Sequence, residues 1–242
     1  MKRYELSDVL FNNIHIVEPY PNMVQPVTKM VNITGFFPGG RGLWLEENST
    51  KFPNIMVLGQ DFSSVKEYIR WAEKAVAEIQ SPTWRNLIVL FKEVGIDLNE
   101  CFFSNVFMGL RDTDKETGKF PGFKDRNFIK RNLEYLQYQI DIVSPDVIIT
   151  LGKFAAELLS KLSETDLEDW NNYKALRIPN IGLKTNVHFK GHICSCVALE
   201  HTSMRNSNVK RRRYKNSKGE YQGNTAEVEM LKDALRLYRV TT

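Results

Sequence analysis

The chain has 242 residues, with 33 basic and 29 acidic side chains but only 3 Cys, 14 Gly and 9 Pro. This composition excludes a disulfide-stapled scaffold, a collagen repeat and a disordered polyelectrolyte, since each needs a strong excess of one residue type. No apolar run approaches the roughly 20 residues that a membrane-spanning helix needs. Because Asn12 and Asn13 also interrupt any signal-peptide core, we expect an intracellular, cytoplasmic protein without a membrane partner.

The net charge of +4 is concentrated in one segment. Residues 201–220 contain seven Lys and Arg against one Glu, a charge of +6, which leaves −2 for the rest of the chain. Concentrated positive charge attracts polyanions such as nucleic acids. A solvated loop without a partner is the alternative, and charge alone does not decide between the two.

The first 50 residues contain scattered turn signals and a Gly-rich stretch at 35–42, with few periodic segments. We expect residues 1–50 to be an N-terminal extension packed on a domain formed by residues 51–242. The Gly-rich stretch lacks the Gly-Lys-Ser/Thr of a phosphate-binding P-loop.

The regular part of the chain alternates strands with helices. Short apolar runs, which are typical of strands buried on both faces, occupy residues 54–59, 101–106, 146–152 and 192–199. Helical spacing and cap signals, including a capping box from Ser64 to Glu67, predict helices over residues 64–82, 83–91, 126–143, 153–162 and 226–240. This order predicts a three-layer α/β/α sandwich around a central, mainly parallel four-stranded sheet.

Polar side chains follow three of the four apolar runs, and in such sheets ligands bind beyond the carboxyl ends of the strands. Asp61, Asn105 and His201 stand at these ends. A carboxylate can orient or deprotonate water, an amide can pair with the donor–acceptor edge of a nucleobase, and an imidazole can donate to an oxygen that gains charge. No strand ends in a Gly-x-Ser-x-Gly elbow, which makes a Ser-His-Asp hydrolase less attractive.

The same strand ends carry a family resemblance. Gly-Gln-Asp at 59–61, Ser-Asn-Val at 104–106, the segment 147–156 and His-Thr-Ser at 201–203 resemble the uracil-DNA glycosylase superfamily in order and in spacing. The resemblance extends over residues 53–205. The first motif is most similar to the branch that reads Gly-Gln-Asp-Pro-Tyr.

The resemblance implies hydrolysis of the N-glycosidic bond between a base and deoxyribose, as in base-excision DNA repair. Asp61 then positions water and stabilises the cationic sugar, and His201 donates to the departing base. Asn105, with Gln60 and Phe62, binds the base. The implied partner is DNA that contains a damaged base, single- or double-stranded. No metal and no cofactor are implied, and we expect a monomer.

Further contacts with DNA follow from the resemblance. The loop after His201 inserts a side chain into the gap left by the flipped base, and Met204 or Arg205 occupies that place. The other residues expected to contact DNA are Ser203, Lys210, Arg211, Arg212 and Arg213. Since a flipped base is held against an aromatic face, the candidates for stacking are Phe36, Phe37, Phe62 and Phe107.

The chain also departs from the family pattern. Phe62-Ser63 replaces the Pro-Tyr whose tyrosine excludes thymine, so selectivity for uracil is not implied, and Thr202 replaces a proline. Three cysteines are too few for the four-cysteine iron–sulfur cluster of other branches. Two other functions stay open: a non-catalytic nucleic-acid-binding member of the fold, and a hydrolase of free nucleotides or nucleosides.

Each candidate residue also has a structural interpretation. Asp61 could cap the helix that begins near Val65, Asn105 could be a turn residue, and His201 could be a surface histidine. The alternation of residues 192, 194 and 196, His, Cys and Cys, places them on one face of a strand. Such a line surrounds an ion poorly, so we expect core cysteines rather than a metal site.

Overall fold

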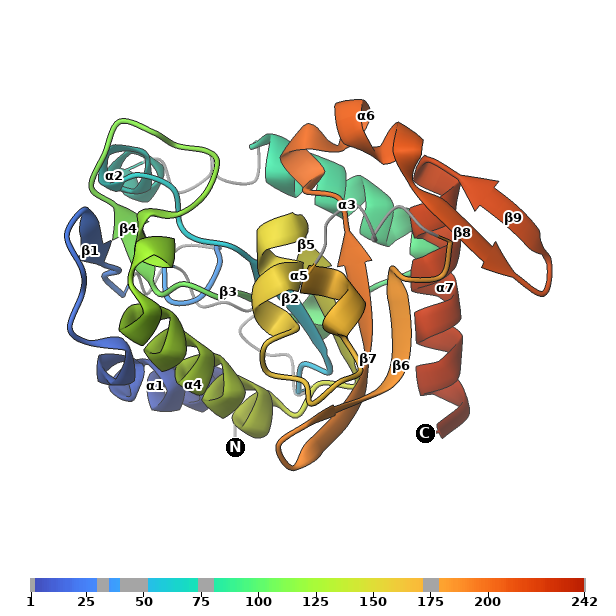
Figure 1. Ribbon diagram of the computed structural model, residues 1–242, viewed down its shortest axis with the longest axis horizontal. Helices are drawn as coiled ribbons and strands as arrows, with labels where there is room; N and C mark the ends of the chain where they lie inside the picture. Colours follow the sequence, from blue (N-terminus) through green and yellow to red (C-terminus); the bar gives the residue numbers. More distant parts are fainter. Residues whose placement is uncertain (1–2, 30–34, 40–51, 74–80, 172–178, 242) are drawn as a thin grey trace.

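The computed structural model describes residues 3–29, 35–39, 52–73, 81–171 and 179–241. Its centre is a five-stranded sheet in the order β3-β2-β5-β7-β6 (Figure 1). The strands are β2 (Ile55–Gly59), β3 (Cys101–Asn105), β5 (Val147–Leu151), β6 (Leu183–Phe189) and β7 (His192–Leu199). Four of them run parallel, and β6 pairs antiparallel with β7 at one edge. The carboxyl ends of the parallel strands therefore meet at one end of the sheet, away from both chain termini (Figure 1).

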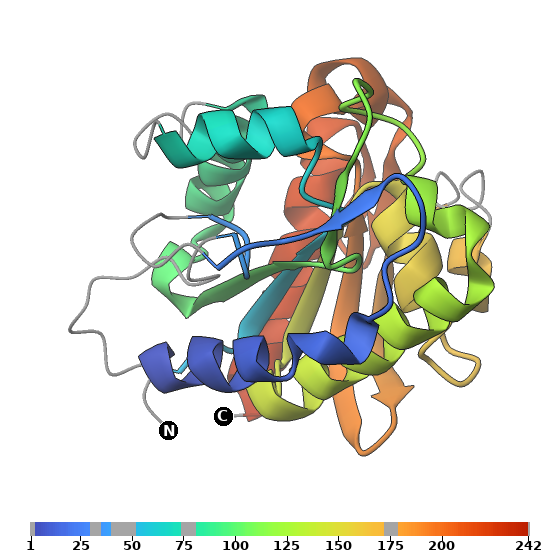
Figure 2. The same ribbon diagram turned by 90° about the vertical axis from the view of Figure 1, so that its left-hand side faces the viewer.

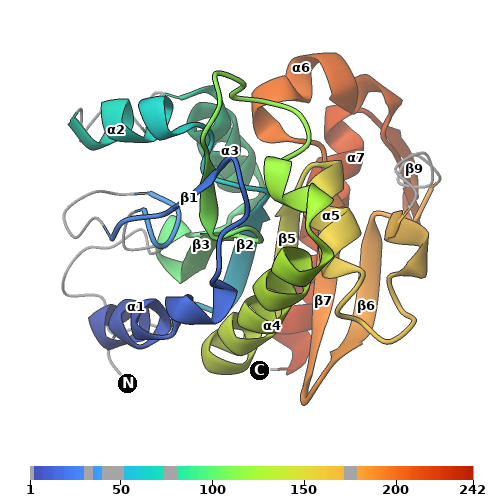
Figure 3. The ribbon, with the colours of Figure 1, turned by 60° about the vertical axis from the view of Figure 1, so that its left-hand side comes forward.

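Helices cover both faces of the sheet (Figures 2 and 3). One face holds α1 (Arg3–Asn12), α4 (Arg126–Val143) and α5 (Lys153–Leu159), and the other holds α3 (Pro82–Val94) and α7 (Asn224–Thr241). Alternate residues of a strand point to opposite faces. In β2, Met56 and Leu58 accordingly join the core with α4, while Ile55 and Val57 join the core with α3. The predicted α/β/α sandwich is confirmed.

The sheet has one strand more than predicted. The four apolar runs form β2, β3, β5 and β7, and in β2, β3 and β5 every residue is buried. β6 lies at the edge of the sheet, and Val187 and Phe189 are the buried residues among its seven. Its sequence, Leu-Lys-Thr-Asn-Val-His-Phe, therefore lacks the continuous apolar run that marks the other strands.

The N-terminal residues pack on the same core. Leu6 and Leu10 of α1 and Val17 join the apolar cluster beneath α4, and the Tyr135 hydroxyl of α4 donates to the Leu10 carbonyl at 2.7 Å. Further on, β1 (Val24–Pro26) pairs antiparallel with β4 (Gly109–Arg111). Residues 30–34 and 40–50, including the expected boundary at residue 50, lie outside the described residues.

Helix α2 (Val65–Glu73) begins at the predicted cap. The Ser64 hydroxyl accepts the Glu67 N–H at 3.2 Å, so Ser64 rather than Asp61 caps this helix. The rest of the predicted helix, residues 74–80, lies outside the described residues. Among the described helices, none combines the length and the apolar character needed to cross a membrane.

After β7 the chain forms an arm that the sequence did not indicate. A short helix, α6 (Arg205–Asn208), leads to a hairpin of β8 (Arg213–Asn216) and β9 (Gly219–Gln222) that packs on α7 (Figure 1). Tyr214 and Asn216 hold the hairpin by donating to the Asp233 carboxylate on α7, at 2.8 and 2.7 Å. The hairpin was missed because charged residues mask its alternation.

Candidate active site

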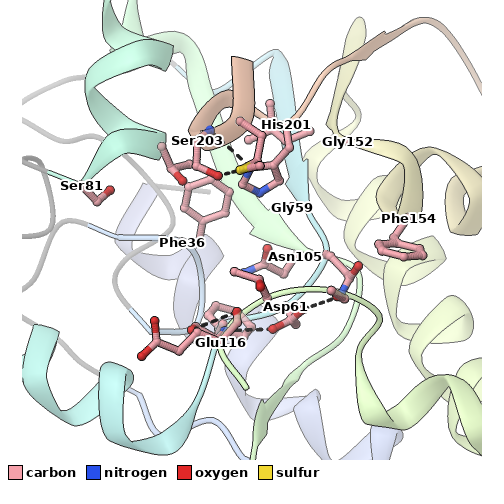
Figure 4. A pocket seen from close by; sticks show the side chains of 18 of the residues that line it. Phe36, Gly59, Asp61, Ser81, Asn105, Glu116, Gly152, Phe154, His201 and Ser203 are labelled. Carbon is pink, nitrogen blue, oxygen red and sulfur yellow. Dashed lines mark hydrogen bonds between the residues drawn. The ribbon is translucent and has the colours of Figure 1, made fainter. Parts of the chain in front are cut away.

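A cavity of about 770 Å³ lies at the carboxyl ends of the parallel strands. It is lined by side chains that follow four strands and by the loop after β4, among them Gln60, Asp61, Phe62, Asn105, Arg111, Gly152, His201, Ser203 and Met204. Asp61, Asn105 and His201 come from three different strands and face this one cavity (Figure 4). The structure thus brings together the three residues singled out at the strand ends, and their chemical roles stay predictions.

Asn105 is placed by the register of two parallel strands. Gly59 of β2 pairs with Asn105 of β3, and a Cβ on Gly59 would lie 2.1 Å from Oδ1 of Asn105. Glycine is therefore needed here so that the amide can fold over the end of β2. Among the described residues, the Asn105 carboxamide has no hydrogen-bond partner, although the residue is only 4% exposed. Its donor and acceptor are available to a ligand in the cavity.

Asp61 carries a buried carboxylate whose two oxygens each accept two hydrogen bonds. Oδ1 accepts from the Ser63 N–H and from Nε of Arg111, both at 2.9 Å. Oδ2 accepts from Nη2 of Arg111 at 2.7 Å and from Nε2 of Gln60 at 2.5 Å. A carboxylate offers about four acceptor positions, so the protein itself fills all of them. Its charge is balanced by Arg111 in a bidentate ion pair.

Arg111 is one of the residues at this site that the sequence analysis missed. Its guanidinium also donates to the carbonyls of Thr117, Gly118 and Lys119, at 3.2, 2.8 and 3.4 Å. It thereby ties the loop after β4 to the carboxylate. One signal was available, because Arg111 ends the apolar run Phe-Met-Gly-Leu at 107–110, and a buried arginine requires a partner of opposite charge.

His201 is held as a neutral hydrogen-bond donor. The Ser203 N–H donates to Nδ1 at 3.3 Å, and the Ser203 hydroxyl lies 2.8 Å from the same nitrogen. Because a backbone N–H can only donate, Nδ1 is the acceptor and the ring proton resides on Nε2. Burial lowers the pKa of His201, against a smaller opposing effect of the Asp61 charge. Nε2 has no hydrogen-bond partner among the described residues and can serve a ligand.

Gly152, at the end of β5, leaves room for the His201 side chain to pack against it. Gly152 adopts a φ of +85°, and a Cβ there would lie 3.0 Å from Cβ of His201. Its N–H donates to the Leu199 carbonyl at 2.8 Å, which draws the ends of β5 and β7 together. A side chain at this position would push the imidazole away from the cavity.

Two of the four predicted stacking residues line the cavity, Phe36 and Phe62. The Phe36 ring packs against Trp84 and Phe103, with ring centroids 5.2 and 5.6 Å apart, and lies beside Gly59. Phe62 meets Tyr68 edge-on at 6.4 Å. The other two candidates, Phe37 and Phe107, are buried in the core and do not line the cavity. The sequence analysis missed Phe154, which also lines it.

The residues expected to contact DNA separate into two groups. Ser203 and Met204 line the cavity and are exposed, and Lys210, Arg211 and Arg213 are exposed beyond it. Arg205 and Arg212, by contrast, are 5% and 1% exposed. Both pair with the buried carboxylate of Glu227, so in this structure neither guanidinium is at the surface where a phosphate would reach it. Their expected contact with DNA stays a prediction, and it would require these side chains to leave Glu227.

Of the alternating residues of β7, the two cysteines form part of the core and His192 is half-buried. Cys194 and Cys196 are buried, with their sulfurs 4.0 Å apart. His192 donates through Nε2 to the Pro145 carbonyl at 2.7 Å. Within the described part of the chain, no three His, Cys, Asp or Glu side chains are grouped so as to hold a metal ion.

Comparison with known proteins assigns the domain. A search of curated proteins found no match. The family model described as the Uracil DNA glycosylase superfamily matches residues 50–221, which is more than half of the chain and includes every side chain discussed above at the ends of β2, β3 and β7. Together with the α/β/α fold, this match shows that the chain belongs to the uracil-DNA glycosylase superfamily.

Proposed function

We propose that this protein is a DNA glycosylase that hydrolyses the N-glycosidic bond of uracil or a related damaged base. Membership of the superfamily supports a glycosylase that acts in DNA repair. The observation that carries the proposal is the meeting in one cavity of the Asp61 carboxylate, a neutral His201 and an Asn105 amide that has no partner among the described residues. In this cavity a flipped base can pair its edge with the Asn105 amide, and the His201 imidazole can stabilise the negative charge of the leaving base.

The proposed reaction breaks the bond between the base nitrogen and the sugar carbon. The bonding electrons leave with the base, which becomes anionic, while the sugar becomes cationic. Nε2–H of His201 donates to the base oxygen that gains charge, and the Asn105 amide pairs with the base edge. These hydrogen bonds strengthen as the negative charge develops, so they lower the barrier rather than only binding the substrate.

Asp61 has the proposed role of positioning the attacking water beside the cationic sugar and acting as its general base. The water oxygen bonds to the sugar carbon, Asp61 takes the proton that the water loses, and the departed base is protonated from solvent. Since its oxygens already accept four hydrogen bonds, one donor has to move aside when the water enters. The Gln60 amide is the donor that is easiest to displace, because it is neutral and keeps a second bond to the Gly118 carbonyl at 3.0 Å. The Arg111 bonds are bidentate and charge-assisted, which makes them stronger.

DNA contacts extend from the cavity toward the hairpin. Phe36 and Phe62 are the proposed stacking faces for the base, and exposed Met204 is the proposed side chain that fills the gap in the base stack. Lys210, Arg211 and Arg213 are proposed to bind phosphates, which dominate the affinity of proteins for DNA.

A second candidate function is supported by the Asp61–Arg111 ion pair. A carboxylate with every acceptor position filled and its charge neutralised resembles a structural group more than a catalytic one. A nucleic-acid-binding member of the fold that does not release bases would retain the cavity and the basic surface, and would have no use for an accessible carboxylate.

Base release distinguishes the two functions. The protein is incubated at low salt with single- and double-stranded oligonucleotides that carry uracil, hypoxanthine or a mismatched thymine, and abasic sites are then cleaved with alkali. The proposed glycosylase converts at least one of these oligonucleotides. Salt-sensitive binding of all of them, with no base released from any, would instead support the binding protein.

A further inference from the structure

Glu227 is a fully buried carboxylate near the start of α7. It lies beyond residues 50–221, the part that matches the superfamily, and it does not line the cavity. Burial raises the pKa of Glu227, and the charges of Arg205 and Arg212 oppose that rise. Burying such a charge costs free energy, because the charged group loses its hydration.

The Glu227 carboxylate contacts three points of the segment that contains His201. Oε1 accepts the backbone N–H of Glu200 at 2.6 Å. Oε2 accepts from Nη1 of Arg205, and Nε of Arg212 lies 3.8 Å from Oε1. The segment is therefore tied to one carboxylate where it leaves β7, in its middle, and where it enters the hairpin.

Arg205 strengthens this connection from the side of the segment. Its Nε and Nη2 donate to Oδ1 of Asn224, at 3.1 and 2.6 Å, so two residues at the start of α7 hold one guanidinium. His201 stands between Glu200 and Arg205, the two residues that Glu227 hydrogen-bonds directly. His201 is thus flanked in the chain by the Glu200 backbone and the Arg205 side chain, both of which Glu227 holds.

We infer that Glu227 is a positioning residue for His201. It holds Glu200 and Arg205, and through them it fixes the loop that seats the imidazole against Gly152 and orients its Nε2 for a ligand. The inference that Glu227 positions His201 rests on these contacts alone. Its expected effect on the rate of base release rests on the proposed function.

The test compares Glu227→Gln with Asp233→Asn by NMR of the His201 ring. Gln keeps an acceptor for the Glu200 N–H but removes the negative charge that faces the buried guanidiniums of Arg205 and Arg212. Asp233 is the matched control, because it lies on the same helix and anchors the hairpin without touching the His201 loop. In Glu227→Gln we expect the His201 resonances to shift and the pKa of His201 to rise toward its ordinary value, since the loop loosens and the ring is hydrated. In Asp233→Asn both should match the wild type.

Unchanged His201 resonances and titration in a folded Glu227→Gln protein would overturn the inference. If that variant does not fold, Arg205→Lys replaces it, since lysine keeps the charge but loses the paired bonds to Glu227 and Asn224. It should shift the same His201 signals, and their constancy would equally overturn the inference.

The rate of base release, measured with and without His201, distinguishes positioning of His201 from a purely structural role of Glu227. Glu227→Gln should lower the rate of base release roughly 10- to 100-fold, as misplacement of a catalytic group does, and should have little further effect when His201 is already Ala. Equal effects in the two backgrounds would contradict action through His201. Loss of the proposed function is recognised separately, because the wild type would then release no base while the NMR comparison still stands.

Discussion

The Asp61 carboxylate and the Arg111 guanidinium form a bidentate ion pair inside the molecule. Their side chains are 5% and 3% exposed, and every acceptor position of the carboxylate is filled. An ion pair of this kind is worth most when both partners are present, since the loss of one leaves a buried charge without compensation.

Replacing Arg111 with Met should therefore destabilise the fold strongly. We expect the free energy of unfolding to fall by about 3–5 kcal/mol, the usual cost of breaking a buried pair, as measured by urea denaturation. Adding Asp61→Asn to Arg111→Met should restore part of the loss, because it removes the stranded charge. A loss within about 1 kcal/mol, typical of an exposed pair, would contradict a buried, energetically coupled pair.

His201 makes stability depend on pH in a defined direction. Burial lowers its pKa below the ordinary 6.5, so the unfolded chain takes up a proton at a pH where the folded ring is still neutral. The contribution of His201 to stability is thus present above pH 6.5 and lost as the pH falls below it. The experiment compares pH 7.5 with pH 5.5, which lie about one unit on either side of the ordinary pKa of histidine. Between these two values the free energy of unfolding should fall more for the wild type than for His201→Gln. Equal losses in urea denaturation would contradict a half-buried ring that is held neutral.

At the scale of elements, the sequence predicted the strands that are buried on both faces and missed the strands that are half exposed. The central strands are continuous apolar runs, and α4 was predicted with its observed bounds, 126–143. The edge strand β6 and the hairpin arm have mixed patterns, so local sequence does not distinguish them from loops. Asp61, Asn105 and His201 were found because the ends of parallel strands converge. Arg111 and Glu227 were not, because the role of Arg111 depends on a partner 50 residues away and that of Glu227 on partners 15 to 27 residues away.

The basic segment, residues 201–220, lies in the arm between His201 and α7. In β8, Arg213 and Lys215 face outward while Tyr214 packs inward, and Lys210 and Arg211 are exposed just before the strand. Two of the seven basic side chains are buried with Glu227, so the charge available to DNA is smaller than the composition suggested.

Changing Lys210, Arg211 and Arg213 together to Gln should weaken DNA binding and flatten its dependence on salt. The slope of log K against log salt should decrease by about 0.9 for each duplex phosphate contact that is lost, as measured by fluorescence anisotropy over a salt series. The matched control changes Lys124, Lys130 and Lys161 to Gln, three exposed lysines that do not line the cavity. An equal change of slope in both variants would show that the arm has no special part in binding.

At the scale of the whole molecule, apolar cores on both faces hold a mainly parallel sheet, and the carboxyl ends of its parallel strands open into one cavity. The helices fix the strands from both faces, Arg111 ties the loop after β4 to Asp61, and Glu227 ties the loop after β7 to α7. The cavity is therefore framed by structures that hold its polar groups in place before a ligand arrives, which is the condition for electrostatic catalysis. The central claim is that this preformed site releases a base from DNA.

The most direct test measures base release and DNA binding by wild type, Asp61→Asn and Asp112→Asn on the oligonucleotide that the wild type converts. Asp112 is the matched control, an exposed carboxylate that follows Arg111 and does not line the cavity. The account predicts that Asp61→Asn slows single-turnover base release by about 100-fold or more, the range of a lost general base, with nearly unchanged binding, while Asp112→Asn matches wild type. Base release by Asp61→Asn at the rate of wild type would contradict it.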